Sequence, residues 1–265
     1  MIVKCLEKDV GTIISYIQHD YPKCLYLYMD LKKYGISSGL LDAYLQLSEN
    51  EIKAVYLSYY SCLHVYSRHN DFNALETLEI LDQHRFSMIY CTEETAKIIW
   101  DAIPDKSCAK KTTGWVARIR TVDKPDHGSA RLANTADFEQ IAKMIYTDED
   151  IGKSYIYSEL AKQLRERSSQ GYTRNLVIKD NNTIIAHACT NAEIDGIAVV
   201  AELVVNPGYR KKGYGAEIWR SLCSQLLREK KEVYSFYYSS ESRALHRKIG
   251  FEEECEWGKI VFQYD

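Results

Sequence analysis

The amino-acid sequence predicts an α+β protein whose mixed, largely antiparallel sheet is flanked by helices, preceded by an N-terminal α/β domain. The first observation is the order of segments in the C-terminal half, where two helices precede three strands joined by two hairpin turns. The second is a polar stretch with glycine and proline, Lys110 to Ser129, between two regions of regular hydrophobic pattern. These observations divide the chain into domains of residues 1–126 and 127–265.

The first domain is predicted to alternate helices and strands. Pro22 suits the first turn of a helix that continues to Tyr34, where Gly35 can end it. β-Branched and aromatic residues predict extended structure from residue 52 to residue 67. The remaining predictions are a helix from Asp71 to Leu81 capped by Asn70 or Asp71, a strand from Phe86 to Cys91, and a helix that Thr92 opens and that runs through Trp100.

The second domain is predicted to begin with two helices, whose caps are Thr135 and Ser158. Two turn signals follow, because Asn181-Asn182 tolerates positive φ and Asp195-Gly196 favours a tight hairpin. The three strands that these turns connect are predicted from Thr173 to Asp180, from Thr183 to Glu193, and from Ile197 to Val205.

Composition and charge exclude several classes of protein. The chain has 265 residues, of which 46% are hydrophobic, with 13 Gly and 4 Pro, so we expect a soluble globular protein. The net charge is −3, without the basic excess typical of nucleic-acid-binding domains. The longest uncharged hydrophobic run, Ala54 to Ser67, is too short and too polar to span a membrane. We therefore expect neither nucleic acid nor membrane as a partner.

The N-terminus and the cysteines indicate a cytoplasmic protein without a metal. Charged residues interrupt the first apolar residues at once, so the hydrophobic core of a secretion signal is missing. The 8 Cys form no C-x-x-C pair and have no histidine at metal-ligand spacing. Reduced, mostly buried thiols are therefore expected, and no metal cofactor.

A basic, glycine-bearing loop follows the predicted strand that ends at Val205. The sequence after Asn206-Pro207 reads Gly-Tyr-Arg-Lys-Lys-Gly-Tyr-Gly-Ala, and an amphipathic helix begins at Gly213. The first N–H groups of a helix lack internal partners and carry partial positive charge, so an anion can bind there. The side chains of Arg210, Lys211 and Lys212 add positive charge. The sequence predicts a site for a phosphate-bearing ligand, and an ordinary solvated basic turn is the alternative.

The pattern Arg-x-x-Gly-x-Gly, which begins at Arg210, resembles the GNAT superfamily of acetyl-CoA-dependent N-acetyltransferases. The resemblance covers roughly residues 128–262. It implies that the motif holds the CoA pyrophosphate and that the preceding strand hydrogen-bonds the pantetheine. By match, the residues assigned to CoA are Leu203, Val204, Val205, Arg210, Lys211, Lys212, Gly213, Tyr214, Gly215, Ala216, Ser239 and Ser242.

Downstream residues extend the resemblance and also depart from it. A predicted strand, Val233 to Tyr238, precedes a segment that looks like the family's fourth helix and its Gly-Phe ending. Many members carry Asn where this chain has Ser239, and a tyrosine thought to protonate the CoA thiolate where it has His246. An imidazolium could perform that proton transfer, since histidine titrates near neutral pH. The alternative is a partly exposed helix residue, with the proton supplied by water.

Glu202 is the second catalytic candidate. It is the one charged residue in an otherwise apolar predicted strand, and burial of a lone carboxylate should raise its pKa toward that of a general base. The alternative is a structural carboxylate that is paired or points to solvent. The resemblance implies direct attack of an amine on the thioester, with a backbone N–H near Val205 polarising the carbonyl. No cysteine lies in a nucleophile motif, and no G-x-S-x-G elbow is present.

We therefore predict an N-acetyltransferase that uses acetyl-CoA as co-substrate and acetylates the primary amine of a small molecule or peptide. The first alternative is an acyltransferase that takes a longer acyl-CoA or an oxygen acceptor. The second is a non-catalytic regulator that binds acyl-CoA, in which histidine for tyrosine marks lost chemistry. The N-terminal half weakly resembles a degenerate GNAT-like half, and an unrelated α/β cap is the other reading. The acceptor's identity stays open, as does the oligomeric state, a homodimer included.

Overall fold

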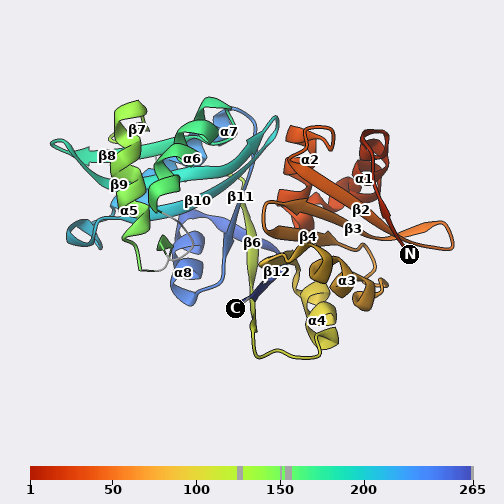
Figure 1. Cartoon of the computed structure of the whole chain (residues 1–265). Helices are drawn as coiled ribbons and strands as arrows, with labels where there is room; N and C mark the ends of the chain where they lie inside the picture. Colours follow the sequence, from red (N-terminus) through yellow and green to blue (C-terminus); the bar gives the residue numbers. More distant parts are fainter. Residues whose placement is uncertain (124–127, 150, 153–156, 264–265) are drawn as a thin grey trace. The chain divides into compact units, whose positions relative to one another are not determined.

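The computed structural model describes residues 1–123, 128–149, 151–152 and 157–263, which form two compact units (Figure 1). Unit 1 comprises Met1–Val116, Tyr237–Ser239 and Glu254–Asp265, and unit 2 comprises Ala117–Phe236 and Ser240–Glu253. The chain thus passes from unit 1 to unit 2 before the predicted boundary at 126/127 and returns to unit 1 twice. The C-terminal segment belongs with the N-terminal unit.

Unit 1 is a sheet with helices on both faces. Its strands lie in the order β1-β2-β3-β4-β5-β12, and only the β4–β5 pair is parallel among the pairings described. The elements are β1 (Ile2–Lys4), α1 (Val10–Ile17), α2 (Leu25–Tyr34), β2 (Leu41–Ser48), β3 (Glu51–Tyr59), β4 (Cys62–Tyr66), α3 (Ala74–His84), β5 (Met88–Thr92), α4 (Glu93–Ala102), most of β6 (Ala109–Ile119) and the C-terminal part of β12 (Phe251–Phe262).

Two hydrophobic clusters hold the layers of unit 1 together. Ile13 of α1 and Leu27 of α2 pack with Val55 of β3 in one cluster. Ile99 of α4 packs in the other with Ile260 of β12, which is fully buried. Alternate residues of the strands point to opposite faces, so each face of the sheet has its own core.

Unit 2 has a largely antiparallel sheet with strand order β11-β10-β9-β8-β7, in which the β10–β11 pair is parallel. Helices α5 and α6 cover one face, where Ile141, Leu160 and Val204 share a core cluster. The elements are β7 (Arg131–Leu132), α5 (Phe138–Tyr146), α6 (Tyr157–Ser169), β8 (Asn175–Asp180), β9 (Thr183–Ile194), β10 (Ile197–Val205), α7 (Tyr214–Arg228), β11 (Glu232–Tyr237) and α8 (Ser240–Ile249).

The two halves of the chain repeat one order of elements: strand, two helices, three strands, helix, strand, helix, strand. Each half also contains a parallel pair in the same place, β4–β5 and β10–β11. The last strand of the second half, β12, pairs with β5 of the first, from Trp257 opposite Thr92 to Val261 opposite Met88. The first half therefore has the same topology as the second.

The element predictions were mostly confirmed, with shifts at the ends. Strand β10 has the predicted bounds, and Thr92 caps α4 through a hydrogen bond from the N–H of Thr95. Three predicted caps were wrong, because Asn73 caps α3, Asn134 caps the short helix before α5, and Ser158 lies inside α6. The predicted linker was also wrong in its first part, since β6 occupies residues 109–119, and residues 124–127 lie outside the described residues.

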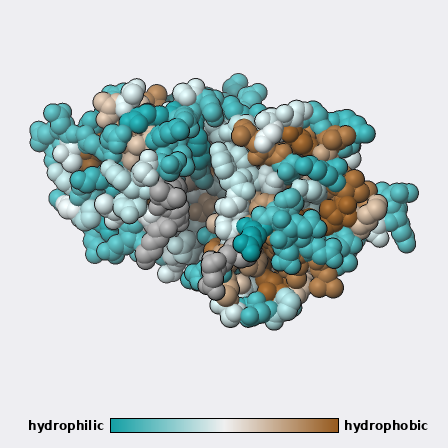
Figure 2. Space-filling view, viewed as in Figure 1, coloured by the Kyte–Doolittle hydropathy of each residue, from teal (hydrophilic) through white to brown (hydrophobic). Residues whose placement is uncertain are grey.

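Surface hydropathy differs between the units. On the face seen in Figure 2 the surface of unit 2 is mostly hydrophilic, whereas hydrophobic surface gathers on unit 1. The exposed apolar side chains of unit 1 include Leu6, Leu40 and Tyr60. Among the residues described, every helix is too short or too polar to cross a bilayer.

Candidate active site

The parallel strands β10 and β11 separate partway along their length. They are paired from Ile197 and Glu232 to Val200 and Ser235, whereas β10 continues to Val205. Over its last residues, the edge of β10 that faces β11 carries no strand pairing in the described part of the chain. A ligand that reaches this edge can form hydrogen bonds with the strand backbone.

A bulge and a turn determine which groups face this open edge. The register with β9 shifts between Ala201 and Val204, so β10 contains one extra residue there, and Glu202 has a φ of 51°. The N–H of Asn206 donates to Ile185 of β9 at 2.9 Å. Because N–H groups alternate between the two edges of a strand, the N–H of Val205 points to the open edge.

The loop after β10 leads into helix α7 through a short helical turn and a glycine N-cap. The side chain of Asn206 accepts a hydrogen bond from the N–H of Gly208 and begins a short helical turn, Pro207–Tyr209. Gly213 is the N-cap of α7, with a φ of 96° and no side-chain capping bond. This conformation favours glycine, and it leaves the first N–H groups of α7 free of a capping side chain.

Gly215 allows the first turn of α7 to lie against β10. A Cβ atom at Gly215 would stand 3.3 Å from Val205 Cγ2 and 3.6 Å from Leu203 Cδ2. Leu203 and Val205 therefore face α7, whereas Val204 faces α5 and α6 on the other side of the sheet. The start of α7 and the open edge of β10 are thus adjacent. A ligand that carries an anionic group on an extended chain can therefore contact both.

The three basic side chains of the loop lie differently from one another. Arg210 donates from Nε to the carbonyl of Val205 at 3.1 Å and from Nη2 to Asp148 at 3.1 Å. The ammonium of Lys212 lies 5.0 Å from the ring centre of Tyr209, whose hydroxyl donates to Asp180 at 2.7 Å. Lys211 is exposed. Arg210 therefore braces the strand end against the residues that follow α5.

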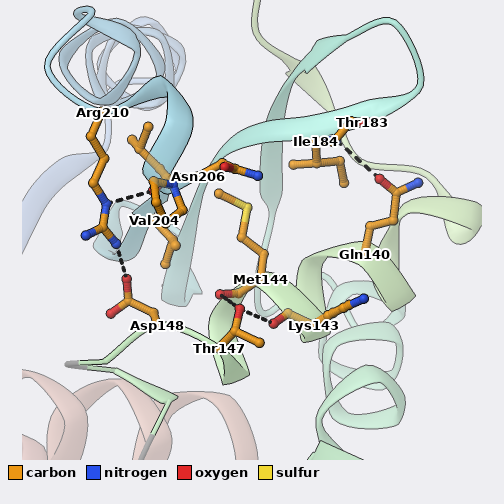
Figure 3. A pocket seen from close by; sticks show the side chains of 12 residues that line it. Gln140, Lys143, Met144, Thr147, Asp148, Thr183, Ile184, Val204, Asn206 and Arg210 are labelled. Carbon is orange, nitrogen blue, oxygen red and sulfur yellow. Dashed lines mark hydrogen bonds and ion pairs between the residues drawn. The ribbon is translucent and has the colours of Figure 1, made fainter.

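A cavity of about 430 Å³ opens beside this loop, on the face of the sheet that α5 covers (Figure 3). Residues from the end of α5 form one wall, and the ends of β9 and β10 form the other. The ion pair between Arg210 and Asp148 closes one side of the cavity in Figure 3. The residues that line it are Gln140, Lys143, Met144, Thr147, Asp148, Thr183, Ile184, Val204, Val205, Asn206, Pro207 and Arg210.

Glu202 lies at the bulge of β10 and is partly buried. The thiol of Cys189, on the neighbouring strand β9, donates to its Oε2 at 3.4 Å. Burial and the charge of Glu202 hold the pKa of the Cys189 thiol well above its usual range, so the thiol keeps its proton and stays a donor. The carboxylate is thus positioned by a side chain that the local pattern did not indicate.

His246 lies in the interior of unit 2. This burial differs from the setting predicted for an imidazolium that gives its proton to the CoA thiolate. Its side chain packs edge-on against Trp219, with ring centres 4.8 Å apart, and His246 is 3% exposed. Nδ1 lies 2.7 Å from the carbonyl of Ser242 and must be the donor, so Nε2 accepts from the hydroxyl of Ser235 at 2.8 Å. Burial lowers the pKa of His246 to about 4, and this environment favours a neutral, structural imidazole.

This burial makes the stability of the protein depend on pH. The folded pKa of His246 lies below the value of about 6.5 expected in the unfolded chain, so the unfolded state binds a proton first as the pH falls. Stability present above pH 6.5 is therefore lost between about pH 6.5 and pH 4. We expect the free energy of unfolding to fall by about 2 kcal/mol per such histidine between pH 7 and pH 5.

Urea unfolding at pH 7 and pH 5 checks this expectation. Between the two pH values, the free energy of unfolding of His246→Gln should fall by about 2 kcal/mol less than that of the wild type. Burial also lowers the pKa of His64 and of His187 to about 4, so part of the pH dependence should persist in the variant. An equal loss in wild type and variant would contradict the burial of a neutral His246.

The two serines assigned to CoA belong to different units. Ser239 lies in the turn before α8 and is part of unit 1, whereas Ser242 lies in the first turn of α8 in unit 2. The carbonyl of Ser242 accepts the hydrogen bond from His246. The remaining assigned residues, on β10, in the loop and at the start of α7, lie together in unit 2.

The corresponding loop of unit 1, residues 67–73, all of which the structure describes, differs from this loop in the features that favour an anion. Between β4 and α3 the sequence reads Ser-Arg-His-Asn-Asp-Phe-Asn, without glycine. The side chain of Asn73 already accepts from the N–H of Leu75 at 3.0 Å, and the acidic Glu76 follows in the first turn of α3. A side-chain cap and a carboxylate at a helix start both disfavour anion binding.

Sequence reasoning missed residues that come from distant parts of the chain. Asp148 and Lys143 line the cavity and Cys189 contacts Glu202, but none belongs to a motif. A carboxylate just after a helix and a cysteine in a strand are common features, so the local sequence carried no signal for them. Within the ranges the structure describes, no three or more His, Cys, Asp or Glu side chains form a group that could hold a metal ion.

Residues 137–251 match the acetyltransferase (GNAT) family. No curated protein matches the chain. The match spans α5 to the start of β12 and includes the loop and both parallel strands described above. It confirms the resemblance that the Arg-x-x-Gly-x-Gly motif indicated.

Solved structures with the same fold cover nearly the whole chain. A Drosophila protein has a TM-score of 0.71 at 13% identity, over 99% of this chain and 98% of its own. A GNAT-family acetyltransferase from Colwellia psychrerythraea has a TM-score of 0.62 at 9% identity, over 99% and 100%. A tandem GNAT protein from the clavulanic acid biosynthesis pathway has a TM-score of 0.59 at 12% identity, over 100% and 99%. These structural similarities confirm the fold class. They also agree with the observation that the two halves of the chain have the same topology.

Proposed function

Residues 137–251 form a domain of the GNAT acetyltransferase family, and from this premise we propose that the chain transfers acetyl from acetyl-CoA to a primary amine. The family and the fold support acyl transfer from an acyl-CoA in general. The acetyl donor, the amine acceptor and direct attack without an acyl-enzyme are our proposal. The observation that carries it is the glycine N-cap of α7 beside the open edge of β10.

The residues present fit a CoA thioester. The N–H groups of Tyr214, Gly215 and Ala216 at the start of α7 would hold the pyrophosphate, since the N-cap Gly213 places no side chain over them. The open edge of β10 at Leu203 and Val205 would hold the pantetheine, because no described strand pairs with its backbone on that side. Acetyl-CoA would supply the activated acetyl group.

The protein's own contribution to the chemistry would come from β10. The N–H of Val205 would stabilise negative charge that develops on the thioester oxygen, since it points to the open edge. Glu202 would accept a proton from the ammonium form of the acceptor, directly or through a water molecule, so that the neutral amine attacks. The Cys189 thiol donates to the carboxylate of Glu202 and would position it for this role.

Seven of the 8 Cys support direct attack over a covalent intermediate, and the eighth, Cys108, is exposed. Burial raises the pKa of the thiols to about 11 for Cys5 and Cys255 and to about 12 for Cys62. A thiol must ionise to act as a nucleophile, and these remain protonated at neutral pH. Burial raises the pKa in the same direction for Cys24, Cys91, Cys189 and Cys223.

Calorimetric titration with acetyl-CoA, followed by an amine screen monitored by thiol release, tests the proposal. We expect a dissociation constant in the micromolar range, which corresponds to a binding free energy of about −8 kcal/mol. We also expect a release of CoA that depends on an added amine. Tight binding without turnover of any amine would favour the non-catalytic acyl-CoA-binding regulator. No binding by the folded protein would reject the proposed function altogether.

A further inference from the structure

A buried histidine of β9 lies beside the bulge of β10. His187 is 0% exposed and stands opposite Val204 of β10 on one side and Val177 of β8 on the other. Side chains directly opposite each other in antiparallel strands share one face of the sheet, so the imidazole lies in the apolar core that α5 and α6 cover. A polar ring in such a core costs free energy unless its nitrogens have partners.

Both ring nitrogens of His187 face polar groups. Nε2 lies 3.0 Å from the side-chain amide of Asn175, which belongs to β8 and is 3% exposed. Burial lowers the pKa of His187 to about 4, and a backbone hydrogen bond with Glu202 opposes this effect. A backbone group that raises the pKa of an imidazole stabilises the ring proton, which a carbonyl oxygen does and an N–H does not. The carbonyl of Glu202 therefore faces the other nitrogen, Nδ1.

These two contacts determine which nitrogen of the neutral ring carries the proton. A carbonyl oxygen can only accept, so Nδ1 carries the proton, and Nε2 accepts from the amide nitrogen of Asn175. The oxygen and nitrogen of an amide have nearly the same size, so the 3.0 Å contact fits either group. With the proton on Nε2 instead, Nδ1 of His187 and Nδ2 of Asn175 would both be buried without a partner in the part of the chain that the structure describes.

The bulge is the part of β10 that needs such a contact. Between the pairs that Cys189 and His187 form with β10, the two residues Glu202 and Leu203 oppose a single residue of β9. The extra residue of a bulge is left out of the regular ladder, and Glu202 has a φ of 51°, which side chains of its kind rarely adopt. A strained backbone conformation persists only where the surrounding contacts hold it.

We propose that His187 is a positioning residue, which donates from Nδ1 to the carbonyl of Glu202 and so holds the bulge in the conformation that orients the Glu202 carboxylate. Asn175 keeps the ring in this orientation through Nε2. Cys189, two residues along β9, holds the carboxylate itself through the hydrogen bond to Oε2 at 3.4 Å. The catalytic part of this inference rests on the proposed function, whereas the hydrogen bond to the bulge does not.

The position of the proton can be measured without any activity. In protein labelled with 15N-histidine, the chemical shift of each ring nitrogen shows whether it carries a proton, and His187→Leu identifies the His187 signals among those of the 7 His. At about pH 7 we expect a proton on Nδ1 of His187 and none on Nε2. A proton on Nε2, or a ring that titrates near the ordinary pKa of about 6.5, overturns the proposal.

Two variants of His187 separate the hydrogen bond from the volume of the ring. His187→Leu fills the core but removes the donor. His187→Asn can place an amide N–H where Nδ1 stands, because both nitrogens are attached to Cγ, although the smaller side chain leaves a larger void. We expect His187→Leu to lower kcat by about 10 to 100-fold and His187→Asn to recover most of this loss. A purely structural role predicts the opposite order, since the void destabilises the protein.

The matched control is Thr190→Val, which removes buried hydrogen bonds from the same strand. Thr190 is 0% exposed, and its hydroxyl accepts from the N–H of Arg174 at 2.8 Å and donates to Glu193 at 3.1 Å. Loss of these bonds should lower the stability by about 1 to 3 kcal/mol. Because none of them touches the bulge, kcat should stay within about twofold of the wild-type value.

Failure of this inference can be told apart from failure of the proposed function. A wild-type protein that turns over no amine rejects the proposed function and with it the catalytic role of His187, while a proton on Nδ1 would still support the hydrogen bond to the bulge. An active wild type in which His187→Leu keeps its kcat, or in which His187→Asn is no better than His187→Leu, overturns the positioning role and leaves the proposed function intact.

Discussion

Gly213→Asp is expected to weaken acetyl-CoA binding at least about 100-fold, which is about 2.7 kcal/mol. Gly213 is the N-cap of α7, and its φ of 96° leaves the helix start open to a ligand. A carboxylate there would cap the N–H groups that the pyrophosphate requires and would repel its charge. Calorimetric titration of the purified variant measures the loss.

The matched control is Gly213→Asn, which has the same size and the same positive φ to accommodate. Asparagine and aspartate both tolerate this conformation better than other side chains, so the two variants share the backbone strain. We expect Gly213→Asn to lose far less affinity than Gly213→Asp, because it adds no charge. Equal affinities of two well-folded variants, as judged by thermal unfolding, would contradict an anion site at α7.

Glu202→Gln is expected to lower kcat by about 10² to 10⁴, the usual contribution of a general base. The amide keeps the shape of the side chain and can still accept from the Cys189 thiol 3.4 Å away, but it cannot take a proton. Binding of acetyl-CoA should stay within about twofold of wild type. Steady-state kinetics with the best amine of the screen, over a range of pH, measures both quantities.

Glu241→Gln serves as the control, because Glu241 is exposed in the first turn of α8. It removes one negative charge from unit 2 without touching β10, and its kcat should match wild type. A Glu202→Gln enzyme with unchanged kcat and an unchanged pH profile would assign Glu202 a structural role at the bulge. The proton acceptor would then have to be another group or water.

Features encoded by neighbouring residues were predicted well from the sequence. Strand β10 is apolar from Ile197 to Val205 except at Glu202, and the structure has the same bounds. The loop that follows contains Gly213, whose positive φ only a permissive residue adopts readily, so the start of α7 could be placed within one residue. In this segment the local propensities and the glycine motif indicate the same structure at the same positions.

Features that depend on tertiary contacts could not be predicted in the same way. The motif placed His246 at the family's tyrosine position, but the burial against Trp219 that makes it neutral depends on how α7 and α8 pack. The partner of Arg210 is Asp148, 62 residues earlier in the chain, and no periodicity links the two. The stretch taken for a linker contains alternating polar and apolar residues of β6, whose partner strands come from elsewhere in the sequence.

The sheet of unit 1 includes a strand that is synthesised long after its neighbour. Residues 257–261 pair with residues 88–92 of β5, so this edge of β5 stays open on the ribosome until residues 257–261 have been made. An open strand edge invites pairing with another nascent chain. A truncation that removes residues 257–261 therefore damages a sheet whose other strands come mostly from the N-terminal half.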